Sequence, residues 1–356
     1  MRVLLMIQKL HQGGGTETHV LTLATALKNK GHQVILYTGG GAWILHAKSL
    51  GIRVHEASHR LRYPGMAANA LHQFLKTQPC DVIHAHDGFS MATVGELARR
   101  YPQLTRIVFT VHGHYVQNSV IRANAHQANH IIVVSPVLRA KVVQTCGVNP
   151  QKVVIIPNGI PTSVFHPKVI TAYRRMYRIP TSSFVVGYAG RFTFDKLQNS
   201  LAISHLLQHL SQSTTSMHAL IAGRNATHYI KSTSRVHVLG HVNQMQNVYN
   251  SCDVVIGSGQ VALEALSTGR PVLVAGKSAY YGLVTPVNVR QIHRTNFGDH
   301  GVTHRLSTFA LAADIHRAES DPRALLRNSA ALRAYVKSHA SASQMATRLL
   351  AVYRAR

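Results

Sequence analysis

The chain has 356 residues, 46% of them hydrophobic, which is too long for one ordinary core and suits two domains of roughly 150 residues each. Its 38 Lys and Arg residues against 12 Asp and Glu give a formal net charge of +26, which favours polyanionic partners such as an anionic membrane surface. We expect no specific nucleic-acid partner, because the sequence contains no zinc-finger spacing and no aromatic-glycine RNA-binding motif. A generally basic proteome is the alternative explanation of the charge.

No apolar run reaches the roughly 18 residues needed to cross a bilayer, and the segment from Met1 to Met6 forms only a first strand. We therefore expect neither a signal peptide nor a transmembrane helix. Cys80, Cys146 and Cys252 are odd in number and far apart, which favours unpaired thiols in a reducing cytosol over a disulfide or a metal site. The expected location is cytoplasmic, with peripheral contact to the inner face of the cell membrane left open.

The first half alternates apolar runs with helical patterns, as βα units do. The strands expected there are Arg2–Ile7, Val34–Tyr37, Ile52–Glu56, Asp81–Asp87 with its exit, Arg106–Gly113 with its exit, Ile131–Ser135 and the run from Val153 to Gly159; the helices are Thr16–Lys30 and Ala42–Ser49. A glycine loop, Gly13 to Glu17, stands where the first strand meets the first helix. Residues without side chains there let the backbone approach a ligand closely, although a flexible turn has the same composition.

Polar residues follow the later strands of this half. In open α/β sheets, ligands bind beyond the carboxyl ends of the strands, so His86, Asp87, His112 and Ser135 are candidates by position. A single histidine in a chain that has 25 is more often a surface or core residue. Arg60 and Arg62 belong to a basic segment, and such a run of charge is usually a solvated face.

The second half repeats the alternation. The strands expected are Phe184–Ala189, Ala219–Ala222, Val236–Leu239, Asp253–Ile256 and Val272–Ala275; the helices are Leu197–Leu210, Asn243–Cys252 and most of the chain from Ser307 onward. The first of these strands ends at Gly190 and is followed by Arg191 and Lys196 beside a helix start. Backbone N–H groups, the positive end of the helix and two fixed cations make this a phosphate-binding arrangement.

The segment from Asp253 to Pro271 is also strand, glycine loop and helix. Its Glu264 is placed to accept hydrogen bonds from ribose hydroxyls, with interaction with the helix dipole as the structural alternative. Two cations for a diphosphate and one carboxylate for a ribose indicate a nucleotide-sugar site.

These residues also carry a resemblance. Gly190-Arg191 with Lys196, followed by Ala-Leu-Glu-Ala-Leu-x-x-Gly-Arg-Pro-Val from Ala262 to Val272, resembles the donor half of the family-4 glycosyltransferases of the GT-B fold. The resemblance implies an α/β fold of two Rossmann-like doubly wound domains facing each other across a cleft. It implies an acceptor-binding domain over residues 1–165, a nucleotide-sugar-binding domain over 166–338, and a C-terminal helix over 339–356 that crosses back to the first domain.

The resemblance also implies roles for single residues. The expected catalytic residues are His112, which would bind the donor sugar or the transition-state charge, Arg191 and Lys196. The expected donor-binding residues are Gly14, Gly15, Gly190, Arg191, Lys196, Gly240, Ser258, Gly259, Gln260, Val261 and Glu264. The expected acceptor-binding residues are Thr16, Glu17, His86, Asp87, Arg60 and Arg62. No Asp-x-Asp pair of the kind that holds Mg²⁺ under a diphosphate is present, so we expect neither a metal nor another cofactor.

The sequence departs from the family pattern at two places. A second glutamate is common eight residues before the one at Glu264, where it touches the donor sugar, but this chain has Ile256 there. An acidic residue is also common shortly after an Asn-Gly turn, where this chain has Ile160-Pro161-Thr162. The first departure leaves recognition of the sugar to Ser258, Gln260 and the backbone between them.

The sequence therefore predicts a retaining, hexosyl-transferring glycosyltransferase that uses a nucleoside-diphosphate sugar, UDP-linked by family habit, and a cell-envelope glycan, lipid-linked or other acceptor. Two alternatives stay open. One is a non-catalytic protein of the same fold that binds polyanions or membranes, and the other is a nucleotide-sugar epimerase or hydrolase, which would need a cluster of acidic groups.

Overall fold

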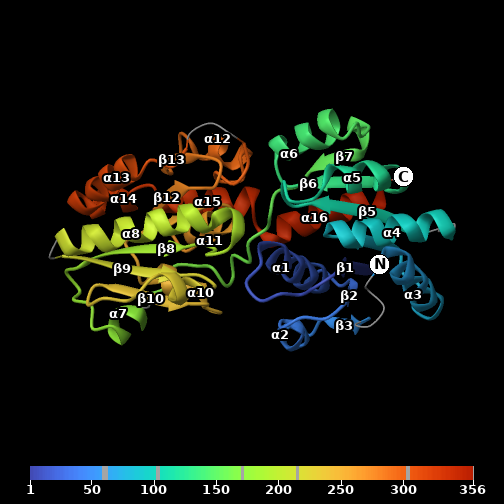
Figure 1. Cartoon of the computed structure of the whole chain (residues 1–356), viewed down its shortest axis with the longest axis horizontal. Helices are drawn as coiled ribbons and strands as arrows, with labels where there is room; N and C mark the ends of the chain where they lie inside the picture. Colours follow the sequence, from blue (N-terminus) through green and yellow to red (C-terminus); the bar gives the residue numbers. More distant parts are fainter. Residues whose placement is uncertain (58–62, 102–104, 170–171, 214–215, 302–304, 356) are drawn as a thin grey trace. The chain divides into compact units, whose positions relative to one another are not determined.

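The computed structural model describes residues 1–57, 63–101, 105–169, 172–213, 216–301 and 305–355. The chain divides into two compact units, each built on one sheet (Figure 1). Unit 1 comprises Met1–Gly159 and Ala342–Arg356, and unit 2 comprises Ile160–Ser341. Each unit is Rossmann-like, with a mostly parallel sheet between helices, so the expected α/β fold class is confirmed.

The sheet of unit 1 is parallel throughout its described strands, in the order β3-β2-β1-β4-β5-β6-β7. Its strands are β1 (Arg2–Ile7), β2 (Gln33–Thr38), β3 (Arg53–Glu56), β4 (Val82–Ala85), β5 (Arg106–Val111), β6 (His130–Val133) and β7 (Val153–Ile155). Alternate residues of β1 enter two different cores, with Leu4 and Met6 on one face and Val3 and Leu5 on the other. The strand order reverses between β1 and β4, which makes their carboxyl ends the switch point of this sheet.

The helices of unit 1 cover both faces of that sheet. They are α1 (Gly15–Asn29), α2 (Ile44–Ser49), α3 (Pro64–Thr77), α4 (Gly88–Arg100), α5 (Asn118–Asn124), α6 (Pro136–Ala140) and α16 (Ala342–Arg354), with short turns η1 (Ala125–Gln127), η2 (Lys141–Thr145) and η3 (Pro150–Lys152). Residues of α3 and α4 pack in one core, and residues of α1 and α16 pack together in the other. The last helix is therefore part of the first unit.

The boundaries between the units differ from those expected at residues 165 and 338. Unit 2 begins at Ile160, which is fully buried in the core of that unit and whose N–H donates to the carbonyl of Ala340 at 2.8 Å. That hydrogen bond holds the two ends of unit 2 together, so the segment after Gly159 belongs to unit 2 and α16 begins only at Ala342.

Unit 2 has the sheet order β10-β9-β8-β11-β12-β13, and its strands are β8 (Phe184–Ala189), β9 (Met217–Ala222), β10 (Val236–Gly240), β11 (Val254–Gly257), β12 (Val272–Ala275) and β13 (Tyr280–Leu283). Only the last pair, β12 and β13, is antiparallel among the strands described. The helices are α7 (Ala172–Met176), α8 (Leu197–Ser213), α9 (Ala226–Tyr229), α10 (Met245–Asn250), α11 (Gln260–Ser267), α12 (Val289–Arg294), α13 (Thr308–Ser320), α14 (Pro322–Leu326) and α15 (Ser329–His339), with the turn η4 (Phe194–Lys196) before α8. The strand order reverses between β8 and β11, which is the switch point of unit 2.

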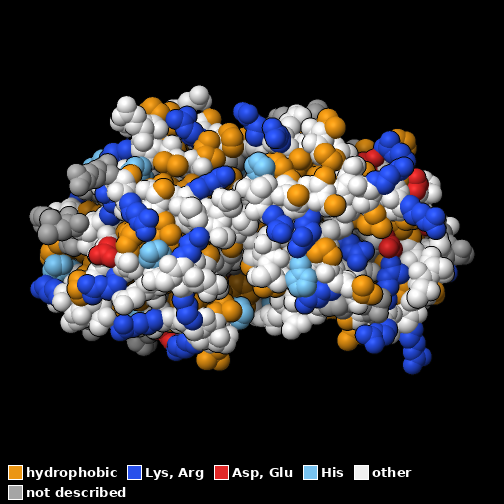
Figure 2. Space-filling model, turned by 180° about the vertical axis from the view of Figure 1, so that it is seen from behind, with side chains coloured by type: hydrophobic (Ala, Val, Ile, Leu, Met, Phe, Trp, Pro, Cys, Tyr) orange, Lys and Arg blue, Asp and Glu red, His pale blue; other side chains and the backbone are white. Residues whose placement is uncertain are grey.

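Within the described ranges, none of the helices combines the length and the apolar character that crossing a bilayer requires. Cys80, Cys146 and Cys252 are free and buried. Lys and Arg side chains are spread over the face shown in Figure 2, and acidic side chains are few there, so the positive charge is not confined to one patch of that face.

Candidate functional site

The predicted donor-binding residues of unit 2 gather at its switch point. Gly190 and Arg191 directly follow β8, and Ser258 and Gly259 directly follow β11, the strand next to it. Because the two strands are parallel, their carboxyl ends meet at one edge of the sheet. The sequence had placed these residues on separate loops, and the strand order brings the loops together.

One carboxylate joins these two loops. Lys196 Nζ donates to Asp299 Oδ1 at 2.7 Å, and Ser258 Oγ donates to the same oxygen at 2.7 Å. The Lys196 and Asp299 side chains are 20% and 19% exposed, so the ion pair is largely shielded from water. An ammonium group has three N–H donors, so this ion pair does not exhaust the capacity of Lys196 to bind phosphate oxygens.

Asp299 was not predicted, because it lies 103 residues after Lys196 in a segment without a strand or helix pattern. Burial by itself would raise the pKa of its carboxyl group, but the charge of Lys196 and the hydrogen bonds from Lys196 and Ser258 outweigh burial and lower the pKa. Asp299 is therefore ionised at neutral pH and fixes the ammonium group at the switch point.

Steric constraints explain the glycines of this site. A Cβ added to Gly190 would clash with Tyr188 Oη, which donates to Ser200 Oγ at 2.8 Å. Ser200 Oγ in turn donates to the backbone carbonyl of Arg191 at 2.9 Å, so this relay holds the backbone of Arg191, whose side chain is exposed. A Cβ on Gly259, which has φ of 55°, would lie 2.5 Å from Asp299 Oδ2.

Glu264 lies on α11 and points into the core of unit 2. It is 7% exposed and accepts a hydrogen bond from Tyr249 Oη at 2.9 Å. Burial raises the pKa of Glu264 to about 7, so at neutral pH a large fraction of this carboxyl group is protonated. The sequence did not predict the Tyr249 partner, and the ribose contact of Glu264 stays a prediction.

The remaining predicted donor residues lie on the same carboxyl edge or at the start of α11. Gln260 and Val261 are the first two residues of α11, and the Val261 side chain lies over Gly257, where an added Cβ would clash with Val261 Cγ1. Gly240 ends β10 with φ of 65°, and its carbonyl accepts from the N–H of Gly223 at 2.8 Å. This hydrogen bond joins the residue at the end of β10 to the residue that follows β9.

Unit 1 also concentrates its predicted residues at its switch point. Asp87 follows β4 and caps α4, where its carboxylate accepts from the N–H of Ser90 at 2.7 Å. The other carboxylate oxygen accepts from the N–H of Gln8, which follows β1, at 2.6 Å. Both oxygens thus tie backbone groups together across the switch point, and burial raises the pKa of Asp87.

The glycine loop after β1 encloses a second carboxylate. Gly14 is the N-cap of α1, and a Cβ there would clash with Glu17 Oε2, so the Glu17 side chain folds back over the loop. Burial raises the pKa of Glu17. Thr16 Oγ1 lies 2.5 Å from Tyr115 Oη, which ties the start of α1 to the segment after β5. Gly15 faces open space, with nothing within 4 Å of an added Cβ.

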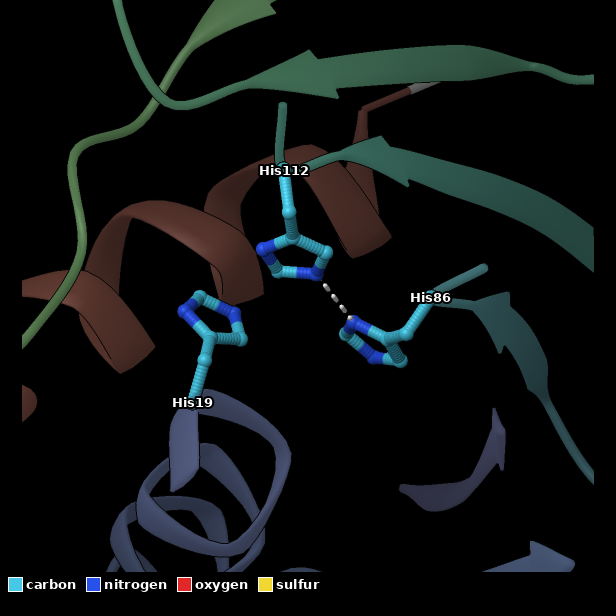
Figure 3. Close-up of side chains that lie close together, drawn as sticks. All are labelled: His19, His86 and His112. Carbon is cyan, nitrogen blue, oxygen red and sulfur yellow. Dashed lines mark hydrogen bonds between the residues drawn. The ribbon is translucent and has the colours of Figure 1, made fainter. Parts of the chain in front are cut away.

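Three histidines complete this cluster (Figure 3). His86 Nδ1 and His112 Nε2, at the exits of β4 and β5, lie 3.2 Å apart and share a hydrogen bond. The ring of His19, on α1, is centred 4.5 Å from that of His112 and 5.7 Å from that of His86. His19 was not predicted, although it stands four residues after Gly15 and therefore on the same face of α1. The predicted residues Arg60 and Arg62 lie outside the described residues.

Comparison with known families finds a match in each unit. The Glycosyltransferase Family 4 model matches residues 13–164, and the Glycosyl transferases group 1 model matches residues 183–285. The chain belongs to the family-4 glycosyltransferases of the GT-B fold. The first match includes the three histidines and the glycine loop of unit 1. The second match includes Arg191, Lys196, Ser258 and Glu264 of unit 2.

Individual relatives are more distant. One subunit of phosphatidylinositol N-acetylglucosaminyltransferase from Homo sapiens is 27% identical over 172 residues, which are 43% of this chain and 35% of that protein. The match thus spans about a third of the curated relative. A glycosyltransferase from Rickettsia africae superposes with a TM-score of 0.78 and 20% sequence identity, over 99% of this chain and 97% of its own. Anabaena HepE in complex with UDP and glucose superposes with a TM-score of 0.77 and 17% sequence identity, over 100% of both chains. At these identities, the two structures establish the GT-B fold alone.

Proposed function

We propose that this protein is a retaining glycosyltransferase that moves a hexose from a nucleoside-diphosphate sugar to an acceptor hydroxyl. Unit 2 binds the donor and unit 1 the acceptor. The observation that carries the proposal is Lys196, held by Asp299 beside Ser258 at the switch point of unit 2. Family membership supports the reaction type, and the UDP and glucose bound in Anabaena HepE favour a UDP-linked donor.

The leaving diphosphate gathers negative charge as its bond to the sugar breaks, and fixed cations stabilise that charge in the transition state. Lys196 is suited to this role because Asp299 fixes its ammonium group before any substrate binds. Arg191 supplies the second cation from a backbone held by Ser200. Since two cations serve the diphosphate, we propose that transfer needs no metal ion or other cofactor there.

Retention is proposed to follow a front-face course. The acceptor oxygen forms its bond to the anomeric carbon on the side from which the diphosphate leaves, and the acceptor proton passes to a diphosphate oxygen. The other route, double displacement, needs a nucleophilic carboxylate at the reacting carbon. Both carboxylate oxygens of Asp87 accept from backbone N–H groups, those of Gln8 and Ser90, which suits a positioning role better than nucleophilic attack. His112 is proposed to contact the donor sugar.

The acceptor is proposed to be a cell-envelope glycan or a lipid-linked glycan. The loop of Thr16 and Glu17, the adjacent His86 and the backbone held by Asp87 offer hydroxyl, carboxyl and imidazole groups to sugar hydroxyls. A cytoplasmic location with peripheral contact to an anionic membrane surface accords with the net charge of +26.

The deciding experiment is a screen of nucleotide sugars for hydrolysis and transfer, with and without a chelator. We expect turnover of one nucleotide-sugar class that survives chelation and falls steeply in the Lys196→Ala and Arg191→Ala variants. Near-normal turnover by both variants would refute the assignment of the diphosphate site.

A second candidate, non-catalytic binding of polyanions or membranes, is favoured by the +26 charge and by Ile256 at the position where the family often has a glutamate. Thermal unfolding with UDP, GDP and ADP separates the two functions. A shift specific to one nucleotide supports the enzyme. Tight binding to heparin or anionic liposomes without any nucleotide shift supports the second candidate.

A further inference from the structure

His19, His86 and His112 converge from three different elements, α1 and the exits of β4 and β5 (Figure 3). Their side chains are 3%, 0% and 9% exposed, and one ring nitrogen from each lies within 4.8 Å of the others. Among the described residues, no other group of three or more histidine, cysteine or acidic side chains meets in this way. The three rings thus converge at the carboxyl edge of the unit 1 sheet.

The hydrogen bond between His19 and Asn158 fixes the position of the His19 lone pair. His19 Nδ1 lies 3.0 Å from the side-chain oxygen of Asn158, which accepts only, so Nδ1 carries the proton and Nε2 the lone pair. His19 Nε2 is buried and has no hydrogen-bond partner in the described part of the chain, and the same holds for His86 Nε2. Burying a polar nitrogen without a partner is costly, and His19 Nε2 is such an atom on the side of its ring that faces His86 and His112 (Figure 3).

Two other histidine groups lack this arrangement. His84, which packs beside His86, has both ring nitrogens in hydrogen bonds, to Tyr353 Oη and Thr110 Oγ1 at 2.6 Å each. His218 Nδ1 and His237 Nε2 lie 3.3 Å apart in unit 2, much like His86 and His112, but no third histidine among the described residues joins them. The convergence of three rings therefore distinguishes the cluster at the switch point from the other two histidine groups.

We propose that His19, His86 and His112 form a binding site for a divalent transition-metal ion, with Zn²⁺ as the preferred occupant. Neutral imidazole nitrogens are the ligands that zinc favours, and three histidines leave a fourth position for water or a substrate oxygen. Tetrahedral bonds of about 2.0–2.1 Å place ligand nitrogens about 3.4 Å apart, so the cluster closes on an ion through small side-chain rotations.

The surroundings meet a further requirement of such a site. Metal-bound histidines usually donate their second ring N–H to an oxygen, and Asn158 provides that oxygen for His19. The proposed ion belongs to unit 1, whereas the diphosphate cations belong to unit 2, and the ion shares His112 with the proposed transfer reaction.

The test measures metal binding by the full chain, without any sugar substrate. The protein is freed of metal with a chelator and titrated with Zn²⁺ by calorimetry and with Co²⁺ by visible absorption. We expect one tight site per chain, with a Co²⁺ spectrum of nitrogen ligands in a four-coordinate site. His19→Gln and His86→Gln should weaken Zn²⁺ binding at least about 100-fold, and Asn158→Ala about 10- to 100-fold.

His237→Gln is the matched control, because it disrupts a buried histidine pair of nearly the same geometry, and it should leave the affinity unchanged. Circular dichroism and melting of the metal-free variants show whether each is folded. If a histidine variant fails to fold, the wild-type Co²⁺ spectrum and Asn158→Ala decide. Absence of a one-to-one site in the wild type, or Zn²⁺ binding that His19→Gln leaves intact, would overturn the proposal. Because no donor is present, this result does not depend on the proposed function.

Discussion

Replacing Lys196 with methionine removes the charge of the side chain and keeps most of its length. We expect kcat/KM for transfer to fall on the order of 10²-fold or more, because the charge on the leaving diphosphate loses a fixed cation. The loss should be mainly in kcat, since the charge develops fully only in the transition state. Steady-state kinetics with the donor identified by the screen measure both terms.

The same change also affects stability, and this must be separated from chemistry. Asp299 would lose its charged partner and keep only the hydrogen bond from Ser258. Because the Asp299 side chain is 19% exposed, the cost should lie between that of a surface pair and that of a buried one, about 1–3 kcal/mol. The double variant Lys196→Met with Asp299→Asn removes the uncompensated carboxylate and should recover much of the stability without recovering turnover. Lys277→Met is the control, because Lys277 pairs with Asp195 at 2.9 Å in unit 2 but both side chains are about half exposed.

Either of two results would contradict the catalytic role of Lys196. One is turnover by Lys196→Met within a few-fold of the wild type at saturating donor. The other is a double variant whose activity returns together with its stability, because the ion pair would then serve the fold and not the reaction.

Three further predictions concern stability, sterics and metal dependence. Glu264 has a pKa of about 7 in the folded chain against an ordinary value of 4.5. Between these pH values the folded chain holds a proton on Glu264 that the unfolded chain releases. The free energy of unfolding should therefore fall by on the order of 3 kcal/mol from this group as pH rises from 4.5 to 7. Glu264→Gln should abolish that part of the pH dependence in urea unfolding, and identical slopes for variant and wild type would contradict the assignment. Gly190→Ala should lower Tm and activity together, because the added Cβ would clash with Tyr188 Oη. Gly15→Ala should keep Tm, because no atom lies within 4 Å of its added Cβ, but it should raise the KM of a substrate. An unchanged KM in Gly15→Ala would argue against a ligand approaching that backbone. Transfer should proceed at the same rate with and without added Mg²⁺ or Mn²⁺ in a buffer free of both ions, and a requirement for either ion would refute the metal-free diphosphate site.

Much of the fold was predictable, because its strands are short buried runs that end at glycine or polar residues. Arg2–Ile7 and Phe184–Ala189 were placed to the residue, since a strand buried on both faces is continuously apolar. The short strand β13 was not predicted: Tyr280–Leu283 contains a glycine at φ of 63° and pairs antiparallel at the edge of the sheet, so it lacks that signature.

The candidate site was predictable only where residues follow a strand directly. Gly190 and Ser258 stand at strand exits of unit 2, and His86 stands at a strand exit of unit 1; within each parallel sheet such exits lie along one edge. Asp299 and Tyr249 escaped prediction because their roles depend on contacts with Lys196 and Glu264 that the order of residues along the chain does not reveal. His19 escaped for a different reason, since its position inside an ordinary helical pattern favours packing over chemistry.

The contribution of α16 to unit 1 has a consequence for how the chain folds during synthesis. Unit 2 is continuous from Ile160 to Ser341, so it can complete its core as soon as that segment leaves the ribosome. Unit 1 cannot complete its second core until α16 is synthesised, after all of unit 2. Until then part of that core is exposed and His84 lacks its hydrogen bond to Tyr353. Translation of unit 2 takes roughly 10–40 s at about 5–20 residues per second. The half of the protein made first is thus finished last, and it is the half with most need of protection from aggregation by a chaperone.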